Sequence, residues 1–252
     1  GAKVVLSCRD VASGCMAKNK IMGVVPGADI EVLPLDLTDT VSIRRFSETL
    51  THKLERLDIL LCNAGVVNLN SRQVTKNGDE MHMATNHFGH FALTGLLLPL
   101  LLATEHSRVV LVSSLAYKSG VINFDDLNWS NREYNTFKSY GDSKLANLLF
   151  VSHLNTFLKG KGASTIAISA HPGLTGTERQ QSIGIGGKLA KRVASPVEKG
   201  VRPQLLAAID PQAKANDFYG PKYGLFGNPV KLKLKPLDDQ EARRLWVFSE
   251  KH

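Results

Sequence analysis

Short apolar runs rich in valine, isoleucine and leucine alternate along this chain with longer segments whose apolar residues recur every three to four positions. The first pattern is typical of buried strands and the second of amphipathic helices. Predicted strands cover residues 3–8, 29–35, 57–62, 108–113, 164–170 and 216–219. Predicted helices cover residues 10–23, 39–53, 78–103, 139–158, 196–209 and 238–251, with Asp10 as the cap of the first and Pro99 as a kink or an end of the third.

This alternation indicates parallel strands joined by crossover helices, in one open sheet that is covered on both faces. We therefore predict an α/β fold with a doubly wound, Rossmann-like parallel sheet, forming a single domain over residues 1–252. A chain of 252 residues can bury a core without a metal ion or a disulfide. Residues 176–195 and 222–236 fit neither pattern.

The composition, 43% hydrophobic and 21% charged, is that of a globular protein and excludes a disordered chain, a collagen and a coiled coil. The three cysteines form no CxxC pair, which argues against a disulfide scaffold or a zinc ribbon and for a reducing, intracellular compartment, in the cytoplasm or on the cytoplasmic face of a membrane. The net charge of +8 is scattered, so it indicates a solvated basic surface. No nucleic-acid partner is predicted, because no binding motif accompanies the charge.

Membrane contact is a separate question. The most apolar stretch, residues 88–103, is shorter than the ~20 residues of a membrane span, and the opening residues predict no signal peptide. Residues 230–235 alternate basic and apolar side chains. This pattern indicates either an edge strand protected by lysines or a segment that contacts a membrane surface. The second interpretation would suit a lipid-like substrate.

Ligands of a doubly wound sheet bind beyond the carboxyl ends of its strands. The residues that follow the predicted strands are small, polar or turn-forming, as a cofactor-lined rim requires: Arg9 and Asp10; Asp36 and Leu37; Asn63, Ala64 and Gly65; Ser113 and Ser114; Pro172 and Gly173.

Tyr140 and Lys144 lie four residues apart in a predicted helix, so both occupy one face of it. An ammonium group lowers the pKa of a nearby phenol, and the pair could exchange a proton with an alcohol or a carbonyl. Taken alone, such a pair is more often a surface tyrosine beside a solvated lysine. Ser114 and Asn63-Ala64-Gly65, at the ends of neighbouring strands, favour the catalytic interpretation.

Together these motifs resemble the short-chain dehydrogenase/reductase family over almost the whole chain: Cys62-Asn63-Ala64-Gly65, Asn86, Ser113-Ser114, Tyr140-Gly-Asp-Ser-Lys144 and Pro172-Gly173. Finer features, such as Leu-Ser-Cys8-Arg9-Asp10 and Ser143-Lys144-Leu-Ala-Asn147, are similar to the branch of retinol dehydrogenases and the WW-domain-containing oxidoreductase.

The resemblance implies an oxidoreductase that interconverts an alcohol and a carbonyl of a small, apolar substrate. Tyr140 would be the acid or base, and Lys144 would lower its pKa and bind the nicotinamide ribose. Ser114, rather than Ser113, would bind the substrate oxygen, and Asn86 would hold a water in a proton relay to Lys144.

The remaining implied contacts are with the cofactor. Asp36 and Leu37 would border the adenine, Asn63, Ala64 and Gly65 the adenosine ribose, and Pro172, Gly173, Thr175 and Thr177 the nicotinamide end and the phosphates. Arg9 as a ligand of the 2′-phosphate, with Asp10 as the helix cap, favours NADP over NAD; Arg9 as a surface charge is the alternative.

The chain departs from the family pattern at its beginning, where the first strand, the glycine-rich turn and the first helix are missing. We expect residues 3–8 either to pair with residues 57–62 or to leave the chain marginally stable, and we expect weak binding of NADP. An alternative function follows, that of an inactive member acting through protein contacts.

The glycines of residues 184–187 indicate a lid segment. Three histidines of one helix, His82, His87 and His90, lack the partners of a zinc site, so no metal is predicted. Oligomerisation stays open.

Overall fold

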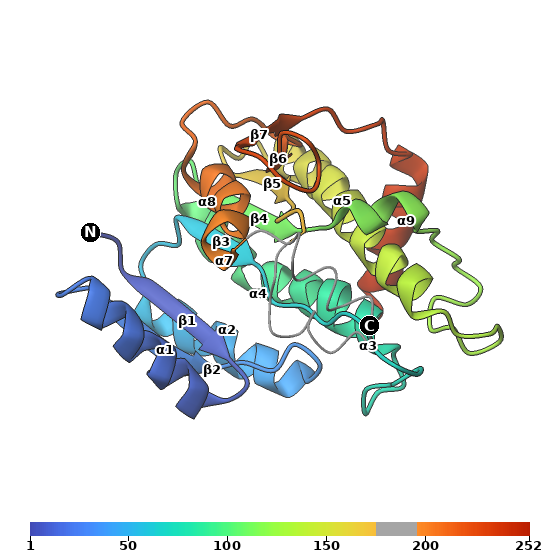
Figure 1. Ribbon diagram of the computed structural model, residues 1–252, viewed down its shortest axis with the longest axis horizontal. Helices are drawn as coiled ribbons and strands as arrows, with labels where there is room; N and C mark the ends of the chain where they lie inside the picture. Colours follow the sequence, from blue (N-terminus) through green and yellow to red (C-terminus); the bar gives the residue numbers. More distant parts are fainter. Residues whose placement is uncertain (175–195) are drawn as a thin grey trace.

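The computed structural model describes residues 1–174 and 196–252 (Figure 1). Its strands are β1 (Val4–Cys8), β2 (Ile30–Pro34), β3 (Ile59–Cys62), β4 (Arg108–Val112), β5 (Ile166–Ala170), β6 (Phe218–Pro221) and β7 (Pro229–Leu232). Its helices are α1 (Val11–Val24), α2 (Thr40–Lys53), α3 (Met81–Met83), the π-helical η1 (Ala84–Phe88), α4 (Gly89–Ala103), the 3₁₀-helical η2 (Leu115–Ser119), α5 (Thr136–Gly160), α7 (Val197–Gly200), α8 (Arg202–Ile209) and α9 (Asp239–Ser249).

Every predicted strand and helix is present, with ends that differ by a few residues, and the α/β class is confirmed. Asp10 caps α1 through the amides of Ala12 and Ser13, as predicted. Pro99 lies inside α4 and does not end it. β7, in the segment that fitted neither pattern, pairs antiparallel with β6 at the edge of the sheet. Its Lys231 is bound to Asp217 at 2.8 Å, which agrees with an edge strand protected by lysines.

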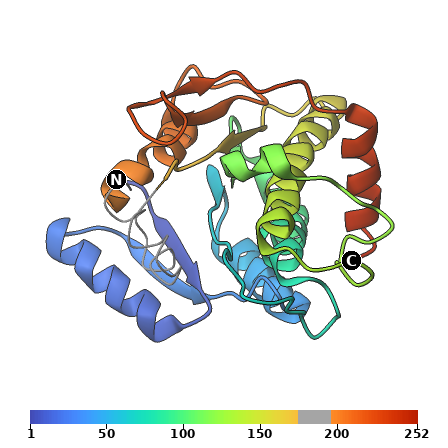
Figure 2. The ribbon, with the colours of Figure 1, turned by 45° about the vertical axis from the view of Figure 1, so that its right-hand side comes forward.

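The strands form two sheets, not the single open sheet that was expected. β1 and β2 pair in parallel, and β3, β4, β5, β6 and β7 form a second sheet in that order (Figure 2). β1 does not shift to pair with β3, because β2 leads into α2, whose Ile43, Phe46 and Leu50 are anchored in the main core. β1 is therefore exposed or half-exposed along its length, and the prediction that it is a buried strand was wrong.

Helices cover both faces of the five-stranded sheet (Figure 1). On one face α2, α4 and α5 bury a core that includes Leu97, Leu101 and Leu154, all at most 1% exposed. On the other face α8 packs Ala207 and Ala208 against β4, β5 and β6. A third cluster joins α5 to α9.

One helical stretch among the described residues, Met81–Ala103, is long and apolar enough to cross a membrane by length and composition alone. It passes this test although residues 88–103 alone were too short. More than half of its apolar window is buried inside the protein, and core helices meet the same test.

Two glycines of α4 differ in their surroundings and give a matched test of the packing. A Cβ added to Gly89 would lie 2.3 Å from the carbonyl oxygen of Leu37, whereas one added to Gly95 would meet nothing within 4 Å. We expect Gly89→Ala to lower the free energy of unfolding by about 1–3 kcal/mol, since the turn after β2 must move away. Gly95→Ala should raise it by up to about 1 kcal/mol through helix propensity. Urea denaturation measures both; equal effects would contradict this packing.

Candidate active site

The carboxyl ends of β3 and β4 bring together residues from three separate parts of the sequence. A Cβ added to Gly65, after β3, would lie 2.9 Å from Oδ1 of Asn86 and 3.6 Å from Nζ of Lys144. Nζ of Lys144 lies 5.5 Å from the centre of the Tyr140 ring. Gly65, Asn86, Tyr140 and Lys144 therefore form one site, in which only a glycine leaves room beside the lysine.

Asn86 lies in η1, where the helix widens by one residue into a π turn, a feature that recurs at functional sites. Its side-chain amide makes three hydrogen bonds. Oδ1 accepts from the amide of Val66 at 2.8 Å, and Nδ2 donates to the carbonyl of Val66 at 3.1 Å and to Oγ of Ser143 at 2.9 Å. Asn86 thus ties the loop after β3 to the helix that carries Tyr140 and Lys144.

His90 supports the same loop, a function that was not assigned from the sequence. Its Nε2 lies 2.8 Å from the carbonyl oxygen of Ala64. Burial lowers the pKa of His90 to about 4, so the ring is neutral at pH 7 and donates one hydrogen bond. The signal in the sequence was its position four residues after Asn86, which places both side chains on one face of the helix.

Lys144 is 4% exposed, which is unusual for a lysine. Nζ donates to the carbonyl oxygen of Val112 at 3.0 Å, at the end of β4. Burial lowers the pKa of Lys144 to about 8. Oγ of Ser113 donates to the carbonyl oxygen of Lys144 at 2.8 Å, so Ser113 holds the helix in place and leaves Ser114 to face a ligand.

Tyr140 is half-buried on the first turns of α5. Burial raises the pKa of Tyr140, and a hydrogen bond with Ser114 opposes this rise. The expected lowering of its pKa by Lys144 is not found, because desolvation of the phenolate dominates while the ammonium is directed at Val112. The protein alone therefore holds Tyr140 protonated and paired with Ser114.

The residues predicted to contact a cofactor are distributed along the strand ends. Arg9 is exposed and has no hydrogen bond or ion pair with the described residues, while the carboxylate of Asp10 is occupied at the α1 cap. Asp36 accepts from the amide and the hydroxyl of Thr38, and Asn63 and Ala64 are exposed.

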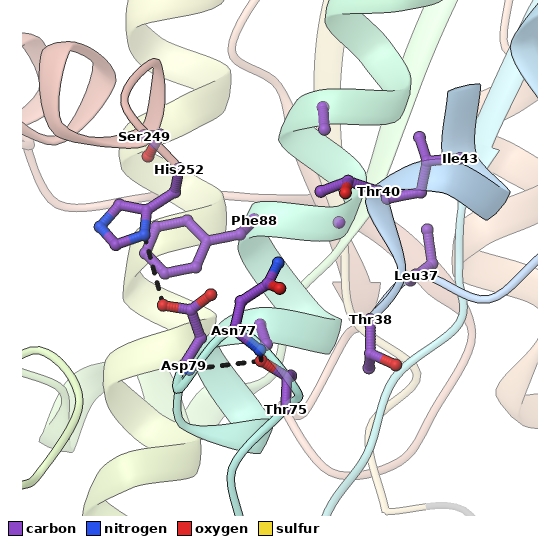
Figure 3. A pocket seen from close by; sticks show the side chains of 13 residues that line it. Leu37, Thr38, Thr40, Ile43, Thr75, Asn77, Asp79, Phe88, Ser249 and His252 are labelled. Carbon is purple, nitrogen blue, oxygen red and sulfur yellow. Dashed lines mark hydrogen bonds and ion pairs between the residues drawn. The ribbon is translucent and has the colours of Figure 1, made fainter.

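Leu37 is buried, in contrast to these exposed residues. It lines a small cavity between the turn after β2, residues 75–79 and the end of α9 (Figure 3). The cavity is lined by Phe88 and by His252, whose ring pairs with Asp79 at 3.3 Å, and by none of Tyr140, Lys144 and Ser114. Leu37 can therefore border an adenine only through its backbone.

After β5, Gly173 has a φ of +72°, which disfavours any residue with a Cβ. Its amide donates to Nδ1 of His171 at 3.2 Å, and Pro172 precedes it at the same strand end. Thr175, Thr177 and the glycines of residues 184–187 lie outside the described residues.

The chain is similar to known proteins over most of its length. The family model described as short chain dehydrogenase matches residues 1–188. Human retinol dehydrogenase 13 is 36% identical over 255 residues, which cover 99% of this chain and 76% of the relative. Human retinol dehydrogenase 14 is 35% identical over 274 residues, which cover 99% of this chain and 78% of the relative.

The chain is also similar in fold to proteins of known structure. An uncharacterised protein from Mycobacterium paratuberculosis is 36% identical and superposes with a TM-score of 0.81 over 100% of this chain and 84% of that chain. NADPH-bound carbonyl reductase from chicken fatty liver shares the fold, with a TM-score of 0.64 at 20% identity over 90% of this chain and 87% of that chain.

The hydrogen bonds of Asn86 predict a large effect of its replacement. Asn86→Leu keeps the size of the side chain but leaves the half-buried amide and carbonyl of Val66 without their partner. We expect the free energy of unfolding to fall by at least about 1–3 kcal/mol, the cost of a buried unsatisfied group. The control is Asn19→Leu on α1, an exposed asparagine with no side-chain bond among the described residues. Comparable losses for both variants, in urea denaturation, would contradict the role of Asn86.

Proposed function

Because the chain belongs to the short chain dehydrogenase family of oxidoreductases, we propose that it interconverts an alcohol and a carbonyl group by hydride transfer, with NADP as cofactor and a small, apolar, retinoid- or lipid-like substrate. The observation that carries the proposal is the convergence of Tyr140, Ser114 and the buried Lys144 at one strand edge. An inactive protein has no need of a lysine held at 4% exposure beside an acid–base tyrosine. The alternative of a non-catalytic member is therefore not favoured.

The described residues fit a dinucleotide at both of its ends. Gly65 leaves free the space that a Cβ would fill between Asn86 and Lys144, which lets a flat ligand approach the backbone. Exposed Asn63 and Ala64, with Asp36, would border the adenosine, and Tyr140 and Lys144 the nicotinamide ribose. When bound, the cofactor would supply or accept the hydride.

The proton is handled by the protein. In the direction of reduction, the hydroxyl of Tyr140 donates its proton to the carbonyl oxygen of the substrate, while the hydroxyl of Ser114 orients that oxygen. The tyrosinate that remains is stabilised by the hydroxyl of Ser114, whose hydrogen bond lowers the pKa of Tyr140. Burial raises the pKa of Tyr140 and so favours the protonated form, which is the acid that reduction requires.

The relay through Asn86 takes a modified form in this proposal. Both N–H groups of its side-chain amide are donated to Val66 and Ser143, so a bound water would have to donate to Oδ1 or use backbone groups of η1. Asn86 then supports the relay by shaping η1.

The preference for NADP rests on charge at the end of β1. Arg9 is free for a phosphate, whereas the carboxylate of Asp10, which would favour the 2′-hydroxyl of NAD, already accepts two amides of α1. Two proteins that share the fold, the chicken carbonyl reductase and Pseudomonas aeruginosa RhlG, have been solved with NADPH or NADP bound.

An apolar substrate would come from a lipid phase, so the proposal includes a membrane contact. Lys233 and Lys235 follow β7, are exposed, and have no ion pair among the described residues. A membrane surface on the cytoplasmic side is the partner that we propose for them, with the substrate drawn from lipid.

Removal of the proton donor tests the chemistry. We expect Tyr140→Phe to lower kcat by roughly 10²–10⁴, the usual contribution of general acid–base catalysis. The measurement is reduction of all-trans-retinal with NADPH, followed as retinol formed. Tyr223→Phe, at an exposed tyrosine, should retain full activity. Unchanged turnover by Tyr140→Phe would rule out the assignment.

Removal of the phosphate ligand tests the cofactor. We expect Arg9→Ala to weaken NADPH by about 1.5–3 kcal/mol, the value of a charge-assisted hydrogen bond, and to leave NADH unchanged. Isothermal titration with each dinucleotide measures this, with Arg44→Ala on the exposed side of α2 as the control. Equal losses for NADPH and NADH would show that Arg9 does not distinguish them.

A further inference from the structure

Asp142 stands between Tyr140 and Lys144 on α5, and its side chain is turned away from both. It is 3% exposed. Oδ1 accepts from the amide of Val121 at 2.8 Å, and Oδ2 accepts from Nε1 of Trp129 at 3.1 Å. A guanidinium nitrogen of Arg132 lies 3.4 Å from Oδ2. All three donors come from residues 120–135, the segment that connects η2 to α5.

This carboxylate faces donors only, so its ionised form, which has acceptors and no hydrogen, matches the site. A proton on either oxygen would be directed at an N–H group. An asparagine would keep the bond from Val121 but would place an NH₂ group opposite Trp129 and Arg132. The position therefore selects a carboxylate.

Trp129 shows that the segment is constrained by this contact. Its φ is +54°, in the left-handed region, which is costly for a bulky side chain. The residue is 5% exposed, its indole donates to Asp142, and the guanidinium of Arg132 lies 3.5 Å from the centre of its ring. The surrounding contacts hold a backbone conformation that the residue alone would avoid.

Residues 120–135 are connected to Ser114 through η2. Oγ of Ser114 caps η2 by accepting from the amide of Ala116 at 3.3 Å. At the other end of η2 the backbones touch, since a Cβ added to Gly120 would lie 2.4 Å from the carbonyl oxygen of Gly141. The next residue, Val121, donates to Asp142. A short, continuous path of contacts thus connects Asp142 with Ser114.

We propose that Asp142 is a positioning residue, which couples residues 114–135 to α5 and so holds the hydroxyl of Ser114 opposite that of Tyr140. Its catalytic consequence rests on the proposed function, whereas the coupling itself does not. Asp142 contacts no reacting atom. It acts by fixing the position of η2 against α5.

Burial and two charged groups, Arg132 and Glu80, determine the pKa of Asp142. Burial raises the pKa of Asp142 to about 6, and Glu80, before α3, adds to the rise, while Arg132 and the hydrogen bonds oppose it. The carboxylate thus gains its proton as the pH falls through about 6, and the bonds from Val121 and Trp129 should weaken together.

The two tryptophans of the chain allow a direct test by ¹H–¹⁵N spectra of the indole groups in the full chain. The Trp129 signal should shift with a midpoint near pH 6, and in Asp142→Asn the shift should be absent. The Trp246 indole, bound to Glu250 at 2.8 Å, should be the same in both proteins. Asp125→Asn, at an exposed carboxylate of the same segment, is the matched control. If the chemical shift of the Trp129 indole changes neither with pH nor in Asp142→Asn, the proposal is overturned.

Hydrogen exchange tests the reach of the coupling without reference to activity. In Asp142→Asn, which loses the bonds from Trp129 and Arg132, the amide of Ala116 should exchange at least about 10-fold faster, with β4 and β5 unchanged. Equal acceleration throughout the molecule would mean a general loss of stability and would refute the coupling. Trp129→Phe, which removes only the indole donor, gives the milder variant if Asp142→Asn folds poorly.

Kinetics with all-trans-retinal and NADPH separate this proposal from the proposed function. We expect Asp142→Asn to lower kcat roughly 10- to 100-fold, since small misplacements of catalytic groups have such effects, with the KM for NADPH unchanged. The double variant with Trp129→Phe should be no slower than Asp142→Asn, because both remove one interaction. An active wild type with an equally active Asp142→Asn refutes the positioning role. An inactive wild type refutes the proposed function instead, and the spectra and exchange then decide the coupling.

Discussion

Backbone groups that leave the ladder of a parallel sheet must find new partners where the strands end, and here the carboxamide of Asn86 provides them. It accepts from and donates to Val66 in the loop after β3, and its second N–H reaches Ser143 on α5. A buried amide or carbonyl without a partner costs about 1–3 kcal/mol, so these bonds fix the loop and the helix against each other. Together with His90, which supports the loop, and Ser113, which holds α5, this side chain sets the spacing between Gly65 and Lys144 on which the site depends.

Buried histidines surround the site, and burial keeps them neutral. It lowers the pKa of His87 to about 3 and those of His90 and His171 to about 4. Because these pKa values lie below the 6.5 of an unfolded histidine, the unfolded chain takes up protons first, and stability is lost as the pH falls from about 6.5 toward 3. Neutral histidines serve as hydrogen-bonding groups, which agrees with the proposed function, in which the proton comes from Tyr140.

Local chemistry made much of the fold predictable. Strand and helix patterns and the Asp10 cap depend on neighbours in sequence or on one periodicity, and the structure contains them. The positions of Gly65, Asn86, Tyr140 and Lys144 were predicted from the ends of the strands and from the family resemblance, and the structure brings these four together. The separation of β1 from β3 could not be predicted, because it depends on how α2 is anchored in the core. Nor could the raised pKa of Tyr140, since desolvation depends on the packing around it.

The partners of Asp142 could not be predicted from the sequence either. It lies inside the motif that identified the site, yet its partners are 10 to 21 residues earlier, in a segment without periodicity. No spacing rule connects a carboxylate on α5 with an indole whose backbone lies in the left-handed region.

The free edges of β1 and β3 have a consequence for the colloidal behaviour of the protein. In the part of the chain that the structure describes, neither edge has a neighbour, and Ile59 and Leu61 of β3 are each 39% exposed. Unpaired edges with apolar side chains are templates for pairing between molecules. The net charge of +8 opposes such encounters, but salt screens it, with a Debye length of about 8 Å at 0.15 M. Low ionic strength should therefore keep copies apart, and added salt should promote their association strand to strand.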